Sequence, residues 1–554
     1  MRRSKEMIGW MFMAFSLIML VNSIRLCLSS DIWYDELFTM GMVEHSYGEL
    51  INFTARDVHP PLYYMIAKLI LDLCKLIIPS ADSVMIVKIV SVMPYFLLLI
   101  YAVTFLKKRF GIFVSGVFMF CILAMPQMSA YTVEMRMYGW ALFFVTATFF
   151  HAYEIVPGGI TVGNSGIEKQ SIENNKINNY RVQNYVAIIL YGLAAAYTQY
   201  FACIAVIMVY LYLLVWFVLS YSKMHDNAHL DKAAIRNLKG WLACVVISII
   251  GYLPWLFVLI SQITAIRDNY WILPLTWRSI GGCVKFLMKP AYGQEWINVA
   301  IAVVLFLTYV SMLAAYGFSG HRNATFFYAL AGCLVLCGLV IFGFIASIVI
   351  RPIFVYRYML PAVGCFWLCF ALCLDNFWSY GRFRLISYDS SGSISPVSIS
   401  SAFSMIILII ILMAGLTDYR AFMGEEEYRA VLMQETKKAL SDIEEDDIIL
   451  YNFDQLQAVC GYYMDQESYL WNAMPEQLII DMFGNKGSIQ DTGSIGQWLD
   501  DGRNVWFFGS FNSREDIREE WEQDGINTEE IGSYMLERYW FNIYKVGNNI
   551  PDSI

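Results

Sequence analysis

Residues 31–64 read DIWYDELFTMGMVEHSYGELINFTARDVHPPLYY and follow directly after the first apolar run of the chain, residues 7–28. This stretch gathers carboxylates in a sequence that is otherwise strongly apolar. Charged side chains are costly to keep close to a lipid bilayer, so in a membrane protein they mark a functional site by default. We therefore expect the chemistry of this chain in the first loop outside the membrane.

The composition predicts a polytopic membrane protein that is mostly α-helical. Of 554 residues, 58% are hydrophobic and only 15% are charged, which is far too apolar for an ordinary soluble domain. A membrane-spanning helix needs about 20 apolar residues. Eleven runs qualify: residues 7–28, 84–106, 112–131, 138–155, 185–199, 201–221, 241–262, 296–318, 325–349, 356–378 and 403–416.

The charges divide the chain into two regions. After Thr417 there are 28 of the 47 acidic residues but only 10 of the 38 basic ones, so this tail carries a net charge of −18 and the rest carries +9. We predict a transmembrane domain over residues 1–416 and a C-terminal domain over residues 417–554. The N-terminal apolar run lacks a small-x-small cleavage site, so we expect an uncleaved first helix.

Residues 60–78 decide the topology, because they are apolar but short and contain Lys68, Asp72 and Lys75. If they lie flat at the membrane surface as an amphipathic helix, all basic clusters of the loops fall on the cytoplasmic side together with Arg2 and Arg3, as the positive-inside rule prefers. These clusters are Lys107-Lys108-Arg109, Lys232-Arg236-Lys239, His321-Arg322 and Arg382-Arg384. Residues 31–78 then form one extracytoplasmic loop with juxtamembrane helices, and the C-terminal domain is also extracytoplasmic.

The tail has the pattern of a small α/β domain. Residues 425–444 have helical spacing, and residues 447–453, 504–510 and 539–546 are β-rich runs between turn residues. It contains no GxGxxG or P-loop, so nothing indicates nucleotide binding. The twelve cysteines form no CxxC pair, which argues against a zinc site or a disulfide in the tail. Residues 156–184 and 385–400 are expected to be loops.

The first loop offers two candidate sites. Asp35 and Glu36 could supply a general base, although adjacent acids also favour the first turn of a surface helix. Asp57 and His59 precede a Pro-Pro pair and Tyr64, where His59 could help the start of a helix bind an anion; a structural turn is the alternative.

Two more candidates lie at the outer ends of later spans. Glu134 and Arg136 could bind a sugar hydroxyl or a metal ion and a phosphate, or pair with each other as an anchor. Arg351 and Arg357 could be snorkelling anchors, or Arg357 could grip a lipid-linked phosphate with its planar guanidinium. Under the charge-derived topology all four candidates face the same side, which fits an amphiphile with a phosphate head and a long apolar tail.

These residues resemble the motifs of the polyprenyl-phosphate-sugar-dependent GT-C glycosyltransferases. The matching segments are Asp35-Glu36, DVHPPLYY at 57–64, SAYTVEMRMY at 129–138, YTQYF at 197–201, YLPW at 252–255 and RPIFVYRYMLP at 351–361. The sequence is most similar to bacterial relatives of the dolichyl-phosphate-mannose protein mannosyltransferases and of the lipid A aminoarabinose transferases. The resemblance covers residues 1–416, and it departs at Gln199, where relatives often have His.

The resemblance implies a GT-C fold and a set of site residues. It makes Asp35, with Glu36, the catalytic acids. It implies donor-phosphate binding by His59, Arg136, Arg351 and Arg357, and substrate binding by Asp57, Tyr64, Glu134, Tyr138 and Tyr358. A divalent cation is possible, and no other cofactor is implied.

We therefore expect a hexosyltransferase of the mannosyltransferase type, which moves a sugar from a polyprenyl-phosphate-linked donor on the outer face of the cytoplasmic membrane. Its acceptor could be a protein, a glycolipid or a cell-wall polymer. A transporter or flippase of lipid-linked sugars would use a similar cavity, but it commonly has repeated halves or broken helices, which we do not find. A noncatalytic scaffold would leave the acids and arginines without a role.

Overall fold

A computed structural model describes residues 2–30, 32–125, 128–156, 167–222, 228–265, 272–318, 324–379, 399–484, 486–536 and 538–548. These residues form two compact units, each of which contains several separate segments of the chain. The membrane unit comprises Met1–Ile24, Asp57–Tyr63 and Val90–Phe422. The loop-and-sheet unit comprises Arg25–Arg56, Tyr64–Ile89 and Met423–Ile554.

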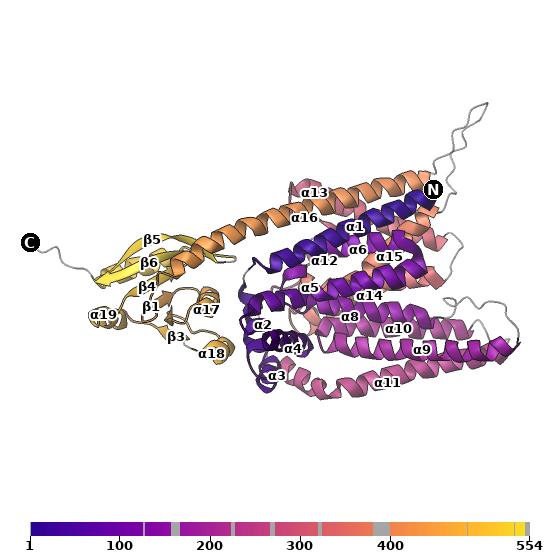
Figure 1. The fold of residues 1–554 in the computed structure, drawn as a ribbon, viewed down its shortest axis with the longest axis horizontal. Helices are drawn as coiled ribbons and strands as arrows, with labels where there is room; N and C mark the ends of the chain where they lie inside the picture. Colours follow the sequence, from indigo (N-terminus) through magenta and orange to yellow (C-terminus); the bar gives the residue numbers. More distant parts are fainter. Residues whose placement is uncertain are drawn as a thin grey trace, which may run out of the picture. The chain divides into compact units, whose positions relative to one another are not determined.

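The predicted spans are largely helical within the described part of the chain, but residues 112–131 divide between α6 and α7, and residues 185–199 extend past the end of α9 (Figure 1). The helices are α1 (Arg2–Cys27), α5 (Ser83–Tyr101), α6 (Lys107–Ala124), α8 (Tyr138–Ile155), α9 (Ile167–Ala196), α10 (Tyr200–Ser222), α11 (Ala228–Ala265), α13 (Glu295–Phe318), α14 (Ala324–Val349), α15 (Leu360–Ser379) and α16 (Ile399–Leu440). Among the described residues, eight helical stretches are long and apolar enough to cross a membrane, and they do not include α8 or α9, which correspond to the predicted spans 138–155 and 185–199. The chain is thus a multi-pass membrane protein, as predicted.

Some boundaries differ from the expected ones. One of the eight stretches, Ser83–Ala124, holds two predicted spans: a short π-helix, η1 (Ala102–Leu106), joins α5 to α6, and Gly111 with φ 88° breaks the helical path. The loop expected over residues 156–184 was wrong from Ile167 onward, because α9 already begins there. The glycines that suggested a loop end at Gly166, and the Glu, Lys and Gln residues that follow favour helix. Residues 385–398, His321-Arg322 and Arg382-Arg384 lie outside the described residues.

Helix α15 lies at the centre of the membrane unit, where it packs against α14, α8 and α6. Its most apolar window is 94% buried, whereas the other seven candidate spans are less than half buried. Small residues let the helices approach closely: a Cβ at Gly332 of α14 would lie 2.4 Å from the Cys365 carbonyl oxygen. The membrane unit is therefore a helix bundle built around α15.

Short helices connect several of these spans. They are α2 (Tyr34–Glu44), α3 (Tyr47–Arg56), α4 (Leu62–Ile77), α7 (Met128–Val133), α12 (Arg278–Met288) and the 3₁₀ turn η2 (Tyr356–Met359). In α4, Leu71 is buried, while Leu69, Leu73 and Leu76 are more than half exposed. This exposed apolar stripe is what a helix at a membrane surface needs, and the flat position of residues 60–78 stays a prediction.

The C-terminal part of the loop-and-sheet unit is an α/β fold, as predicted (Figure 1). Its sheet has the order β3-β2-β1-β4-β6-β5, with β3, β2, β1 and β4 parallel and β6 antiparallel to both neighbours. The strands are β1 (Ile448–Tyr451), β2 (Glu467–Trp471), β3 (Lys486–Ile489), β4 (Val505–Gly509), β5 (Ile526–Leu536) and β6 (Tyr539–Asn548). The helices are α17 (Asp454–Tyr463), α18 (Gln477–Phe483), α19 (Thr492–Asp500) and α20 (Ser513–Gln523).

The sequence predicted β1, β4 and β6 and missed the other three strands. The edge strands β3 and β5 carry few buried residues, and β5 is largely exposed and charged. Strands at the edge of a sheet need no apolar run, so their sequences give a weak signal. The predicted boundary between residues 416 and 417 falls inside α16, and the compact units divide at Phe422 instead.

Residues 25–56 and the C-terminal domain pack together in the loop-and-sheet unit. Helix α2 contacts α17 and α18 so closely that a Cβ at Gly41 would lie 2.6 Å from the sulfur of Met482. Polar contacts join the same elements: Tyr34 donates to Glu476 at 2.9 Å, and Arg56 forms an ion pair with Asp481 at 2.5 Å. The segment that carries Asp35 and Glu36 is thereby fixed to the sheet domain.

Candidate active site

The segment Asp57–Leu62 is fixed in the membrane unit by the connection between α9 and α10 and by α11. The backbone N–H of Leu62 donates to the Tyr197 carbonyl at 3.0 Å, and Gln262 Nε2 donates to the Asp57 carbonyl at 2.5 Å. His59 is only 7% exposed, and its Nδ1 lies 3.1 Å from Asp57 Oδ2. The sequence thus places a buried histidine–carboxylate pair just before α4.

The charges around this pair bring together three of the predicted motifs. Burial lowers the pKa of His59, and the positive charges of Arg136 and Arg357 lower it further, against the opposing effect of Asp57. Burial alone would raise the pKa of Asp57, but His59 and Arg136 outweigh it and leave that pKa below its ordinary value. The electrostatics of His59 thus link it to Arg136 and Arg357, which come from two other motifs.

The segment Arg351–Tyr358 lies between α14 and α15. Ser347 Oγ accepts hydrogen bonds from the backbone N–H groups of Ile353 and Phe354 at 3.2 and 3.0 Å. The Tyr358 ring stacks on Phe201 with centroids 4.8 Å apart. This packing turns the chain back toward the bundle and fixes the two residues on either side of it, Arg351 and Arg357.

Glu134, Arg136 and Tyr138 lie where α7 ends and α8 begins. All three are buried, with Glu134 8% and Arg136 6% exposed. The Arg136 N–H donates to the Glu134 carbonyl at 2.7 Å, and the Arg357 guanidinium lies 5.9 Å from the centre of the Tyr138 ring. Buried ionisable groups in a membrane protein are expensive to maintain, which favours a functional role for this cluster.

A cavity of about 270 Å³ opens beside His59 and Arg351. Its apolar wall comes from α10, α11, α14 and the segment after α14 and consists of Phe201, Cys203, Ile204, Leu259, Ile263, Phe342, Ala346, Ile350 and Ile353. Its polar lining consists of His59, Gln199, Tyr200, Tyr252, Gln262, Arg351 and Tyr358. The cavity thus combines an apolar wall with a polar lining, the arrangement that an amphiphile requires.

Sequence reasoning missed four polar residues of this cavity: Gln199, Tyr200, Tyr252 and Gln262. The first three stand in the segments YTQYF and YLPW, so the signal was present, but the resemblance left the role of Gln199 in doubt because relatives often have His there. Gln262 stands in no quoted motif, and its position in the cavity follows only from the packing of α11.

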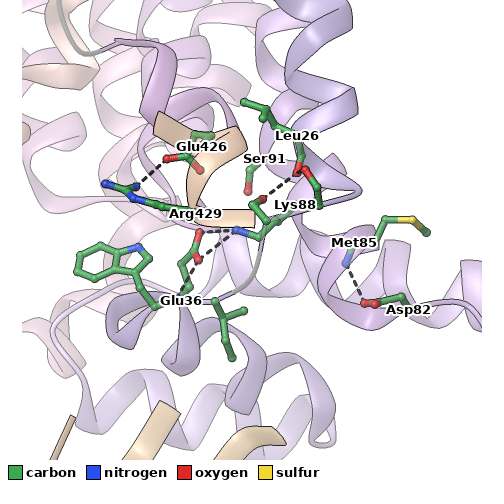
Figure 2. A network of polar contacts seen from close by, with 12 residues as sticks. Leu26, Glu36, Asp82, Met85, Lys88, Ser91, Glu426 and Arg429 are labelled. Carbon is green, nitrogen blue, oxygen red and sulfur yellow. Dashed lines mark hydrogen bonds and ion pairs between the residues drawn. The ribbon is translucent and has the colours of Figure 1, made fainter. Parts of the chain in front are cut away.

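Asp35 and Glu36 open α2 in the loop-and-sheet unit. Glu36 is 1% exposed and forms an ion pair with Lys88, whose Nζ lies 3.2 and 3.3 Å from the two carboxylate oxygens (Figure 2). Glu36 also accepts from the Trp33 N–H at 3.3 Å, which caps α2. Lys88 was not predicted, because it lies inside an apolar span in the sequence.

Asp35 lies close to the C-terminal domain. Burial raises the pKa of Tyr539 to about 12, and smaller effects come from the Tyr34 backbone and the Asp35 carboxylate. In the same unit, the Arg538 guanidinium lies 4.1 Å from the centre of the Trp33 ring. Tyr64 is fully buried. Among the described residues no three His, Cys, Asp or Glu side chains gather to hold a metal ion, and the possible divalent cation stays a prediction.

Comparison with solved structures finds ArnT from Cupriavidus metallidurans in two states, apo and bound to undecaprenyl phosphate. Each comparison has a TM-score of 0.52 and 11% sequence identity and covers 98% of both chains. The chain has a GT-C fold. This confirms the fold that the motifs implied for residues 1–416, and at 11% identity the likeness concerns the fold alone.

Another GT-C structure, the oligosaccharyltransferase of Archaeoglobus fulgidus in complex with Zn and sulfate, matches with a TM-score of 0.39 and 12% identity. That comparison covers 89% of this chain and 68% of the other. No family model and no curated protein matches the sequence.

Proposed function

We propose that this chain is a membrane glycosyltransferase that moves one sugar from a polyprenyl-phosphate-linked donor to an acceptor on the outer face of the cytoplasmic membrane. The cavity beside His59 and Arg351 carries the proposal, because its apolar wall suits an isoprenoid chain and its polar lining suits a phosphate head. A GT-C neighbour with undecaprenyl phosphate bound adds support.

The phosphate is bound by the positive cluster of Arg136, Arg351 and Arg357 together with His59. Guanidinium groups bind phosphate oxygens in pairs of hydrogen bonds and stabilise the negative charge that the leaving phosphate gains. The Tyr138 ring lies next to the Arg357 guanidinium, and the Tyr358 ring stacks on Phe201. These contacts are proposed to maintain the geometry of the site. Glu134 and Asp57 are proposed to bind hydroxyl groups of the substrate, and Tyr64 to support the same segment.

The reaction is a single in-line displacement. The acceptor oxygen forms a bond to the anomeric carbon as the bond from that carbon to the phosphate oxygen breaks, so the configuration inverts and polyprenyl phosphate leaves with the electron pair. Asp35 takes the acceptor proton as general base. Glu36 is bound to Lys88 and to the cap of α2, so its proposed role is to position Asp35.

The fold does not identify the sugar or the acceptor, so both are proposed here from the motifs. A hexose such as mannose is the outcome that the motifs imply, and protein, glycolipid and cell-wall polymer are the acceptor classes. The N-terminus is proposed to be cytoplasmic and the C-terminal domain extracytoplasmic.

The test is transfer of radiolabelled sugar from a synthetic polyprenyl-phosphate donor to envelope acceptors by the full chain in lipid nanodiscs. We expect Asp35→Asn to lower the rate by about 10²-fold or more, because general-base catalysis contributes about that much. Glu49→Gln is the matched control, since Glu49 is an exposed acid of the same loop that bonds only to Ser46. Donor binding with no transfer by the native chain would favour a transporter instead.

A further inference from the structure

Two side chains of the cavity have buried polar atoms without a hydrogen-bond partner among the described residues. Gln199 is 3% exposed, and neither its Nε2 nor its Oε1 is hydrogen-bonded. The hydroxyl of Tyr252 is buried and unbonded in the same way. Both side chains line the cavity, Gln199 just before α10 and Tyr252 in the middle of α11.

The neighbouring polar residues differ, because the fold already uses them. Gln262 donates to the Asp57 carbonyl, and its Oε1 accepts from the Tyr200 hydroxyl. Tyr200 in turn accepts from Trp255 Nε1 at 3.1 Å. Tyr200 and Gln262 therefore form hydrogen bonds within the fold. Gln199 and Tyr252, which line the same cavity, form none with their side-chain polar atoms among the described residues.

Buried polar groups without partners are rare in native proteins, because they lose their bonds to water and gain none in return. When such groups line a cavity, a ligand is a natural partner for them. An amide offers one acceptor and two N–H donors, and a phenol is both donor and acceptor. A phosphate oxygen can only accept, whereas a sugar hydroxyl both donates and accepts and so satisfies both side chains.

We propose that Gln199 and Tyr252 bind hydroxyl groups of the donor's sugar. This inference rests on the proposed function, in which the arginines bind the phosphate and the two unbonded side chains are left for the sugar.

The experiment measures binding of three synthetic lipids to the full chain in nanodiscs: polyprenyl phosphate alone, its hexose form and its amino-sugar form. Gln199→Met, which keeps the volume but removes the amide, is expected to weaken binding of the hexose form about tenfold and of the sugar-free lipid less than twofold. Tyr252→Phe is expected to do the same with a smaller factor. The amino-sugar form is expected to respond to Gln199→Met as the hexose form does, because it also carries hydroxyl groups.

Tyr212→Phe is the matched control. Its hydroxyl is also buried without a partner among the described residues, but Tyr212 contacts Phe149 and Tyr328 and does not line the cavity. This variant is expected to bind all three lipids as the native chain does. The unfolding temperature gives a second readout: Gln199→Met and Tyr252→Phe should unfold no lower than the native chain, because each removes an unbonded polar group.

Three results would overturn the inference. Equal losses for the hexose form and the sugar-free lipid would place Gln199 at the phosphate, and no loss at all would mean that water satisfies the amide. A clearly lower unfolding temperature would make the amide a structural group. If the native chain binds none of the three lipids, the proposed function itself fails, and this outcome is distinct from the other three.

Discussion

The buried ion pair between Glu36 and Lys88 allows a quantitative test of how the first loop is held. Lys88 is 2% and Glu36 1% exposed, and the nearest N–O distance is 3.2 Å. At an effective dielectric constant of about 20, two unit charges at this distance attract by about 5 kcal/mol. Removing one partner of a buried pair typically costs about 3–5 kcal/mol, because the other charge stays buried without compensation.

Lys88→Met removes the positive charge and keeps most of the side-chain volume. We expect the free energy of unfolding to fall by about 3–5 kcal/mol, which lowers the unfolding temperature by roughly 6 to 20 °C for a unit of this size. Thermal unfolding in nanodiscs, followed by tryptophan fluorescence, measures the change. The double variant Glu36→Gln with Lys88→Met should recover much of the loss, since no charge is then left buried.

The exposed pair Arg56–Asp481 is the matched control in the same unit. Its side chains are 43% and 30% exposed, so Arg56→Ala should cost less than about 1 kcal/mol. The reasoning is refuted if Lys88→Met costs no more than this control, or if the double variant loses the sum of the two single losses. Either result would mean that the Glu36 and Lys88 charges are independent and solvated.

Three further predictions concern other parts of the chain. Burial and nearby arginines lower the pKa of His59 in the folded chain, so the unfolded chain binds a proton at this histidine at higher pH than the folded chain does. The free energy of unfolding should therefore fall as the pH drops below about 6.5. His59→Asn should flatten that part of the plot of unfolding temperature against pH. Arg357→Lys keeps the charge but loses the planar fork, and initial rates should show about a tenfold higher KM for the donor with a smaller change in kcat. Asp447 accepts from Trp506 Nε1 at 2.8 Å and Asn504 Nδ2 at 3.0 Å, so Asp447→Ala should cost about 1–3 kcal/mol, seen as faster hydrogen exchange in β1 and β4.

The motif residues were predictable from the sequence because each lies in a short, distinctive segment. Asp57, His59 and Pro60 stand within four positions, and Arg351 and Arg357 frame one loop. Their spacing did not predict which motifs interact with one another. His59 is linked electrostatically to Arg136 and Arg357, which lie about 80 to 300 positions away in the sequence. That link depends on helix packing, and no local pattern encodes it.

Two residues show the same limit most clearly. Lys88 is one charge in an apolar run, and its sequence neighbours say nothing of Glu36, 52 positions earlier. Gln199 is one residue of the aromatic motif YTQYF. Its proposed role in binding the sugar follows from the absence of hydrogen-bond partners for its amide among the described residues. Long-range pairing and the lining of a cavity are properties of the packed chain.

The sequence by itself determined the membrane class, the positions of most long helices, the α/β character of the tail and the acids and arginines of the candidate site. These features follow from composition, from apolar runs of fixed length and from charge distribution, all of which act over neighbouring residues. Only the tertiary structure decided that the first loop and the sheet domain form one compact unit, that Lys88 holds Glu36, and that Gln199 and Tyr252 line a cavity. The physical reason is that close packing and buried charge pairing join residues that are far apart in the chain.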